Sequence, residues 1–346
     1  MLGNLKKIFF TIAKYTGCFH VSRYFYQKRI RFLCYHGFAL DNESEFLPKL
    51  FIDPEVFSGR MRYLKEKGYY VITLDQAVEA LRKGAVPHDA VVLTIDDGFY
   101  GVYSQAAPIL QFYDFPATLY LTSYYFNRQG PIYSLAVKYM FWSSHNVNVD
   151  LRTLCIPGLT ECKSSSEQLS CINLIVEYGQ SLESNEERIQ LLRQLGSLIN
   201  VDYEELDSSR KMGLINAEEL NQLLLMNVDI QMHTHRHDFP LDLRAAKDEL
   251  EKNREKVDPL LSVPMHHFCY PSGLWSEAQR NLLESQGIDS ATTCLPGLMS
   301  EKISFYSIPR FLDGANISQI EYESELAGFS EFCRKFKLWD GSRATQ

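Results

Sequence analysis

Residues 90–98 read AVVLTIDDG, an apolar run that ends in two aspartates and a glycine. A short apolar run rich in β-branched residues is typical of a strand buried on both faces, as in a parallel sheet. Similar runs alternate along the chain with amphipathic segments of helical period, for example at 54–67, 75–83 and 217–225. This alternation of strand and helix predicts an α/β fold built on a parallel sheet or barrel.

Asp96 and Asp97 follow this predicted strand directly. Parallel sheets and barrels of the α/β class place their active sites at the carboxyl ends of their strands. A single aspartate there is often only the N-cap of the next helix. Repulsion between two adjacent carboxylates is relieved best by a cation or a shared proton, so the pair indicates a catalytic or metal-binding site.

Three histidines, at 233, 235 and 237, lie just after another predicted strand at 228–232. His233 and His237 share one face if the chain makes a single helical turn here, which Pro240 would limit. Two imidazoles and one carboxylate, with open positions for water, form a catalytic arrangement for zinc or a similar divalent ion. The alternative is an exposed polar loop, which the aspartate pair disfavours.

The composition is that of a globular protein of 346 residues, long enough for one large domain or two smaller ones. The net charge of −8 argues against a nucleic-acid-binding surface. The eight cysteines include no CxxC pair, and several lie in predicted strands, which favours free thiols in a reducing compartment. We therefore expect a cytoplasmic protein that binds no nucleic acid.

Residues 1–40 contain seven lysines and arginines and no acidic residue. Leu5, Ile8, Phe9 and Ile12 recur at helical spacing, but the apolar run is too short for a transmembrane span or a signal-peptide core. Residues 1–30 therefore form a basic amphipathic segment. It either lies through residues 1–28 on an anionic membrane, at its inner face, or packs against the protein.

Residues 127–211 interrupt the alternation with Ser/Cys-rich text and a polar helical run at 185–199. We expect a largely helical insertion in a barrel that spans 31–330 and is followed by a C-terminal tail at 331–346. Because the insertion follows a strand end, it could cover the catalytic face and shape specificity.

Residues 93–98 resemble the TFDDG motif of the polysaccharide deacetylases, carbohydrate esterase family four, and residues 233–237 resemble their H[ST]xxH motif. Three further segments resemble one branch of the family: Tyr35-His36 its YH motif, residues 268–273 its FxYPxG motif, and residues 308–310 its late LPR segment. The resemblance covers about residues 30–325, apart from the insertion.

The resemblance implies a distorted (β/α) barrel that uses one divalent metal ion, most often zinc, to remove N-acetyl or less often O-acetyl groups from sugars. By position, Asp97, His233 and His237 would bind the metal ion and Asp96 would be the general base. Such an enzyme is a hydrolase of carbon–nitrogen bonds other than peptide bonds.

The third motif, Tyr270-Pro271-Ser272, would contact the substrate, and the Ser272 N–H would hold the oxyanion. The family's usual form of this motif carries an arginine that orients the base, but Cys269 stands in its place. Arg310 either supplies the missing guanidinium or forms a structural salt bridge.

The late motif that usually provides the general acid is also missing, because no histidine follows His267. His36 is the first candidate for the proton donor, the alternative being a core or ligand-orienting histidine, and His235 is the second candidate. His266 and His267 precede a strand on the far side of the predicted barrel and are interpreted as structural.

The motifs define the reacting acetyl group but little of the glycan around it. A cytoplasmic deacetylase with a basic amphipathic start fits a lipid-linked or nucleotide-linked precursor of an envelope glycan. Two alternatives stay open. The first is a catalytically impaired barrel that binds a glycan or a partner, and the second is a hydrolase of a formyl or cyclic amide.

Overall fold

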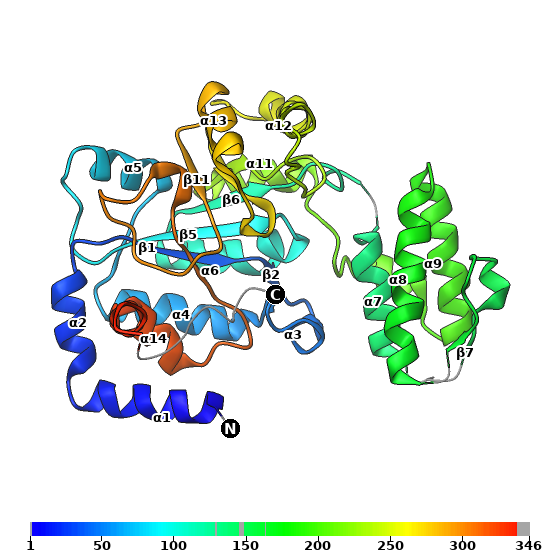
Figure 1. Cartoon of the computed structure of the whole chain (residues 1–346), viewed down its shortest axis with the longest axis horizontal. Helices are drawn as coiled ribbons and strands as arrows, with labels where there is room; N and C mark the ends of the chain where they lie inside the picture. The colour runs from blue at the N-terminus through cyan, green and yellow to red at the C-terminus, as the bar shows by residue number, and fades with distance from the viewer. Residues whose placement is uncertain (1, 129, 145–148, 163, 338–346) are drawn as a thin grey trace. The chain divides into compact units, whose positions relative to one another are not determined.

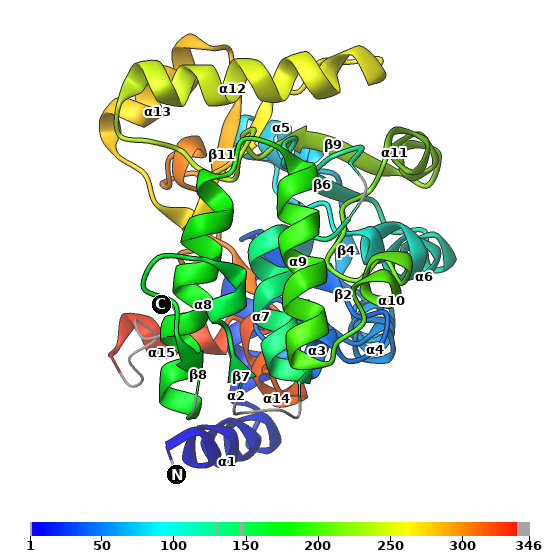
Figure 2. The ribbon, with the colours of Figure 1, turned by 90° about the vertical axis from the view of Figure 1, so that its right-hand side faces the viewer.

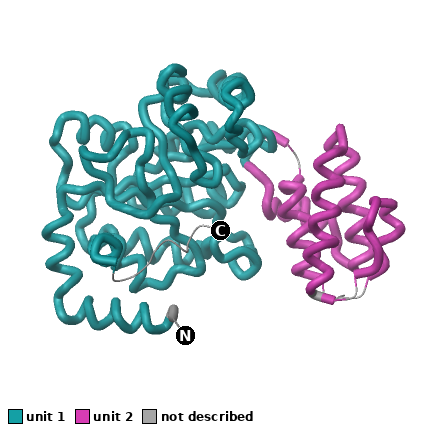
Figure 3. Tube along the Cα trace, in the orientation of Figure 1, with its two compact units in different colours: residues 1–126, 215–346 teal, residues 127–214 magenta. Residues whose placement is uncertain are grey.

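The computed structural model describes residues 2–128, 130–144, 149–162 and 164–337. The chain forms two compact units (Figure 3). Unit 1 comprises residues 1–126 and 215–346, and unit 2 comprises residues 127–214, against the 127–211 expected for the insertion. None of the described helices has the length and apolar character needed to cross a membrane.

Unit 1 is built on an eight-stranded sheet in the order β11-β10-β9-β6-β5-β1-β12, with β4 also paired to β5. Every pairing in this sheet is parallel. The strands are β1 (Arg31–Tyr35), β4 (Tyr70–Val71), β5 (Ala90–Asp97), β6 (Ala117–Leu121), β9 (Val228–Met232), β10 (His267–Cys269), β11 (Ser290–Thr292) and β12 (Phe311–Leu312). The sheet forms a half-barrel with helices between its strands, which confirms the predicted α/β barrel class (Figure 1).

Helices connect these strands, as the sequence period predicts. They are α4 (Pro54–Glu66), α5 (Leu74–Arg82), η1 (Val102–Ala106) with α6 (Ala107–Tyr113), α11 (Ala217–Leu225), α12 (Leu243–Val257) and α13 (Glu277–Ser285), and α14 (Gln319–Leu326) follows the last strand. Short elements complete the unit: β2 (Gly37–Phe38), β3 (Phe51–Ile52), α3 (Glu43–Phe46), η3 (Asp258–Leu260), η4 (Pro271–Gly273) and η5 (Phe305–Ser307).

Both faces of the sheet are buried. Successive side chains of a strand point to opposite faces, so each strand contributes to two cores. One face packs with helices α4, α6, α11, α12 and α13 in the main core, through residues such as Leu33, Leu93 and Phe268. The other face, with Phe32 and Val92, packs against the apolar side of α5. Full burial of one such side chain stabilises the fold by about 1.5–3 kcal/mol.

The first two helices and the last described helix meet in unit 1. Helices α1 (Leu2–Tyr15) and α2 (Cys18–Tyr26) contribute Phe10 and Phe19 to a small core with Phe329 of α15 (Phe329–Lys335). Residues 331–335, which we expected in a tail, therefore belong to a packed helix, because Cys333 is buried in the same core. Residues 338–346 of the expected tail lie outside the described residues.

Unit 2 is largely helical, as expected for the insertion. It consists of α7 (Tyr133–Ser143), α8 (Ser165–Ser181), α9 (Asn185–Ile199) and α10 (Tyr203–Ser208), with the hairpin β7 (Val149–Asp150) and β8 (Glu161–Cys162) and the short turn η2 (Arg152–Leu154). Tyr139, Met140 and Phe141 are buried, so these side chains belong to the core of the unit.

Candidate active site

The two adjacent aspartates are the last two residues of β5 and differ in backbone conformation. Asp96 is buried, whereas Asp97 adopts a left-handed backbone conformation with a φ of 72°. Gly98 follows with a φ of 95°. Left-handed conformation at a residue with a side chain costs of order 1–3 kcal/mol and persists only where the surrounding structure imposes it. The turn therefore directs the two carboxylates to different neighbours.

Asp97 lies beside His233 and His237, which follow β9. The Nε2 atom of each imidazole is 3.4 Å from Oδ1 of Asp97. The Nδ1 atom of His233 is 2.8 Å from the carbonyl oxygen of Cys269, so it carries the proton and leaves Nε2 facing Asp97. Among the described residues, the buried Oδ1 of Asp97 has no hydrogen-bond donor. Asp97, His233 and His237 each direct one ligand atom to the same place, and one carboxylate with two imidazoles fits a divalent ion.

The two histidines reach this position through a loop. The helical turn that would place both on one face does not form: Thr234 and His237 have φ values of 63° and 58°, and no helix lies between His233 and the start of α12. Asn253 of α12 holds the loop, because its buried amide donates hydrogen bonds to the carbonyl oxygens of Thr234 (2.8 Å) and Leu121 (3.0 Å). Nothing in the local sequence pattern connects Asn253 to the histidine motif.

The charge states around Asp97 follow from this packing. Burial by itself would raise the pKa of Asp97, but the neighbouring imidazoles of His237 and His233 lower it to about 2. Burial lowers the pKa of His237, which favours the neutral form that ligates metals. The pKa of His233 is raised despite burial, because Cys269 and Asp97 stabilise its charged form, so a bound cation would take the place of its Nε2 proton.

Arg310 pairs with Asp96 from the beginning of β12. Its Nη1 and Nη2 atoms each lie 2.7 Å from one carboxylate oxygen, and both side chains are buried. Arg310 also donates hydrogen bonds to Thr94 Oγ1 (3.1 Å) and to the Thr293 carbonyl (3.0 Å), which fix its plane. Burial alone would raise the pKa of Asp96, but the guanidinium keeps it well below its usual range. The structure thus brings a guanidinium to the predicted base. Nη2 of Arg310 also lies 3.1 Å from Sγ of Cys269.

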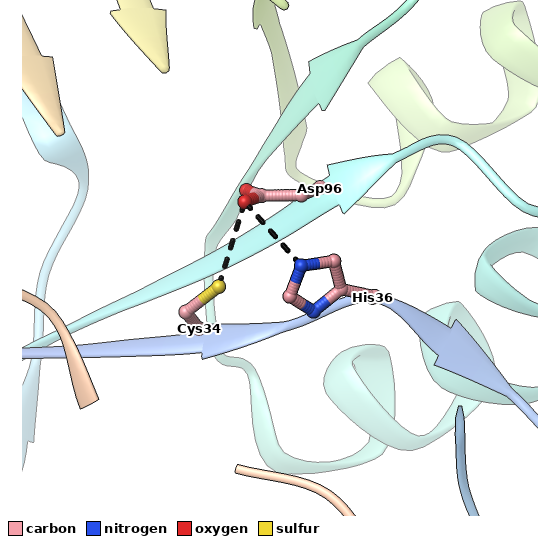
Figure 4. A group of neighbouring side chains, drawn as sticks. All are labelled: Cys34, His36 and Asp96. Atoms are coloured by element: carbon pink, nitrogen blue, oxygen red, sulfur yellow. Dashed lines mark hydrogen bonds and ion pairs between the residues drawn. The ribbon is translucent and has the colours of Figure 1, made fainter. Parts of the chain in front are cut away.

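His36 and Cys34 reach the same carboxylate from the end of β1 (Figure 4). His36 Nε2 lies 3.8 Å from Asp96 Oδ2, and the Cys34 thiol lies 3.6 Å from the same oxygen. Burial raises the pKa of Cys34 well above its usual value, so this residue is a neutral thiol. Sequence reasoning missed Cys34 as a site residue, although its spacing of two from His36 places both on one side of the chain.

The third motif divides between the core and the surface. Tyr270 was expected to contact substrate, but its ring is fully buried between Phe239, Phe268 and Trp275. That expectation is wrong for the Tyr270 side chain because it points into the main core, and Pro271 is buried as well. Ser272 is exposed, with a left-handed φ of 55°.

His235, the second candidate for the proton donor, contacts Ser123, whereas His36 lies near Asp96. The Nδ1 atom of His235 is 2.9 Å from the hydroxyl of Ser123, and its ring packs edge-on against Tyr124.

Comparison with known proteins shows which sequences the chain resembles. The sequence model described as polysaccharide deacetylase matches residues 179–291, which contain His233, His237 and the third motif. Over 200 residues the chain is 24% identical to YxkH of Bacillus subtilis (strain 168), provisionally named a polysaccharide deacetylase; the match covers 54% of this chain and 68% of that protein. Over 56 residues it is 45% identical to poly-beta-1,6-N-acetyl-D-glucosamine N-deacetylase of Escherichia coli (strain K12), covering 16% of this chain and 8% of that protein.

The fold is also similar to those of solved structures. The Streptococcus pyogenes deacetylase PplD in complex with acetate matches with a TM-score of 0.57 and 16% identity, over 86% of this chain and 98% of that one. IcaB from Ammonifex degensii matches with a TM-score of 0.55 and 13% identity, over 88% and 97% of the two chains. Together with the motif order, these matches show that the chain is similar to polysaccharide deacetylases over residues 179–291 and that it shares the fold of the solved structures.

Proposed function

We propose that this protein hydrolyses an N-acetyl group, less readily an O-acetyl group, on a sugar of an envelope glycan or its precursor. One observation carries the proposal: Asp97, His233 and His237 converge beside the Arg310-paired Asp96. The choice of an N-acetyl sugar is supported by the relative named as a poly-N-acetylglucosamine N-deacetylase.

Asp97, His233 and His237 would hold one divalent ion, which we propose to be zinc. Two imidazoles and one carboxylate are ligands that zinc accepts while keeping a position for water. When bound, such an ion supplies polarisation of the acetyl carbonyl and a lowered pKa of water. The buried Oδ1 of Asp97, which lacks a donor among the described residues, is the atom that most needs this cation.

The chain's own groups move the protons. Asp96 stays ionised because Arg310 pairs with it, so it accepts the proton of the attacking water. We assign protonation of the leaving amine, as the carbon–nitrogen bond breaks, to His36, whose Nε2 atom lies 3.8 Å from Asp96 Oδ2. The backbone N–H of the exposed Ser272 would stabilise the oxyanion. The products are acetate and the free amino sugar.

A panel of acetylated sugars tests this function. Acetate and free amine should appear from one or more nucleotide-linked, lipid-linked or polymeric N-acetylhexosamines. We expect Asp97→Asn to lose zinc and activity together, and Asp96→Asn to lose activity while keeping zinc. His88→Ala changes an exposed histidine outside every motif and serves as the control.

Release of formate in preference to acetate would replace this proposal with the formyl-amide alternative. Intact zinc binding with no hydrolysis of any substrate would favour the impaired, glycan-binding barrel.

We also propose that α1 brings the enzyme to an anionic membrane at its cytoplasmic face, where a lipid-linked sugar is found. Phe10 and Ala13 pack against the protein, but Leu5, Ile8 and Ile12 on the opposite side of α1 are 55–58% exposed. The helix therefore packs through Phe10 and Ala13, and the side that carries Leu5, Ile8 and Ile12 is open. Both views place α1 at the margin of unit 1, beside α14 (Figures 1 and 2).

A further inference from the structure

A second cluster of two histidines and one aspartate lies where α5 meets the start of β10. The Nε2 atoms of His266 and His267 are each 3.0 Å from Oδ1 of Asp75. The candidate active site has the same three ligand types, with two imidazole nitrogens around one carboxylate oxygen. In both clusters the three ligand atoms lie within 4.8 Å of one another.

The second nitrogen of each ring is already occupied. His266 Nδ1 is 3.1 Å from the carbonyl oxygen of Pro264, and His267 Nδ1 is 2.8 Å from the hydroxyl of Ser290. A carbonyl only accepts hydrogen bonds, so Nδ1 of His266 carries a proton. A neutral His266 then turns the lone pair of Nε2 toward the carboxylate of Asp75. These groups repel each other unless a proton or a metal ion lies between them.

Such outer hydrogen bonds are characteristic of histidines that ligate metals, because they fix the ring and its tautomer. The backbone of the pair is fixed as well. The buried Gln231 accepts hydrogen bonds from the backbone N–H of His266 (2.9 Å) and of His267 (2.8 Å). Asp75 has 65% of its side chain exposed, so an ion could enter from solvent without opening the core.

This cluster is remote from the candidate active site. Asp75 lies in the first turn of α5, which follows β4, and Val71 of β4 pairs with Val91 near the start of β5. Asp97 ends the same strand six residues farther along. At about 3.3 Å per strand residue, the two ends of β5 are separated by about 20 Å.

We propose that Asp75, His266 and His267 form a second binding site for a divalent transition-metal ion such as zinc. Imidazole with carboxylate suits zinc, cobalt, nickel or copper better than magnesium or calcium. The ion would join α5, whose apolar side covers one face of the sheet, to the first residue of β10. Its role is therefore structural and does not depend on the proposed hydrolysis.

Zinc stoichiometry of the full chain, after removal of metal with a chelator, tests the proposal. We expect two zinc ions per wild-type chain and one in Asp97→Asn. In the Asp97→Asn background, adding Asp75→Asn should weaken the remaining site at least about 100-fold, because a direct ligand is lost. Zinc should raise the melting temperature of Asp97→Asn, and Asp75→Asn should abolish that rise.

Glu79→Gln is the matched control, since it removes an exposed carboxylate from the same helix and should leave the stoichiometry at two. Asp75 is exposed, so its replacement by Asn is compatible with folding, which circular dichroism verifies. His266→Gln provides an independent loss of one ligand and should behave like Asp75→Asn.

A single zinc ion in wild type that disappears in Asp97→Asn would overturn the second site and leave the proposed active site intact. Unchanged stoichiometry in Asp75→Asn would overturn it as well, and would identify the bridging cation as a proton on an imidazole. A zinc ion retained by Asp97→Asn and lost with Asp75→Asn would support the second site even if no substrate is hydrolysed.

Discussion

Asp96 and Asp97 are neighbours in the sequence, yet their surroundings give them different chemistry. Asp96 accepts two hydrogen bonds from a buried guanidinium, while Asp97 faces two imidazole nitrogens. A carboxylate held ionised by a fixed positive charge is suited to accept a proton, whereas one that lacks a donor is suited to ligate a cation. The assignment of base and ligand therefore rests on the partners of each side chain.

Replacing Arg310 tests whether it positions Asp96 or only stabilises the fold. The pKa of Asp96 lies below its usual range in the wild type, so the base stays ionised as the pH falls. Without the guanidinium, burial raises that pKa, and the acid limb of kcat/KM should move to higher pH by one unit or more, roughly. Arg310→Met should show this shift, and Arg310→Lys should restore part of the wild-type profile.

Arg60→Met is the control, because Arg60 is equally buried and pairs with the buried Asp313 at 3.1 Å. Removing one member of either pair should lower the free energy of unfolding by about 3–5 kcal/mol. Only Arg310→Met should move the pH profile. If the pH dependence of kcat/KM in Arg310→Met shifts no more than it does in Arg60→Met, Arg310 forms a structural salt bridge.

The turn that ends β5 determines the geometry of the aspartate pair. Gly98 has a left-handed φ, and a Cβ added there would lie 2.3 Å from Leu121 Cδ1 at the end of the neighbouring β6. Two requirements thus coincide at this glycine: a backbone conformation that L-residues avoid, and close contact between adjacent strand ends.

Comparing Gly98→Ala with Gly68→Ala separates these two requirements. Gly68, after α4, also has a positive φ, but no heavy atom lies within 4 Å of its added Cβ. Gly68→Ala should cost about 1 kcal/mol of unfolding free energy, the cost of the conformation alone. Gly98→Ala should cost a further 1–3 kcal/mol, roughly, and weaken zinc binding because Asp97 moves.

Urea unfolding and zinc titration of the two variants provide the measurements. Equal destabilisation, with zinc affinity unchanged in both, would show that the β5 turn tolerates a side chain and does not hold the ligand.

The whole chain presents an uneven distribution of charge and apolar surface. Its overall charge is −8, but its first 40 residues contain no acid. Two of the lysines in α1 are already engaged with α14, Lys6 with Glu321 and Lys14 with Glu323. The open side of α1 therefore contributes mainly apolar contact, so we expect burial of its side chains to dominate membrane affinity.

Vesicle co-sedimentation tests the proposed membrane contact. Wild type should bind anionic vesicles, and added salt should weaken this binding. Ile8→Ser combined with Ile12→Ser should reduce binding by more than tenfold, roughly, because each buried isoleucine is worth about 1.5–3 kcal/mol. The melting temperature of this double variant should equal that of wild type, since neither isoleucine packs in the small core with Phe10.

Leu225→Ser changes an even more exposed apolar residue, on α11, and is the control that should leave vesicle binding unchanged. If wild type sediments with neither anionic nor neutral vesicles, the membrane contact and the argument for a lipid-linked sugar are both excluded.

Local sequence patterns were sufficient for the framework of this protein. The strand at 228–232 and the helices at 185–199 and 217–225 have the bounds that their side-chain pattern predicts. This works because side-chain period and burial are properties of a short segment. The aspartates and histidines at strand ends could be grouped for the same reason, since parallel strands present their carboxyl ends at one edge of a sheet.

Those local patterns did not predict which residues far apart in the sequence would contact one another. Arg310 and Asp96 are 214 residues apart, and they meet because β12 and β5 flank β1 in the sheet. The sequence left open whether Arg310 would reach the base, which side of α1 would be covered, and how His237 would reach His233. It also misplaced the Tyr270 ring. Each of these depends on strand order and on packing across the fold, which short-range periodicity does not encode.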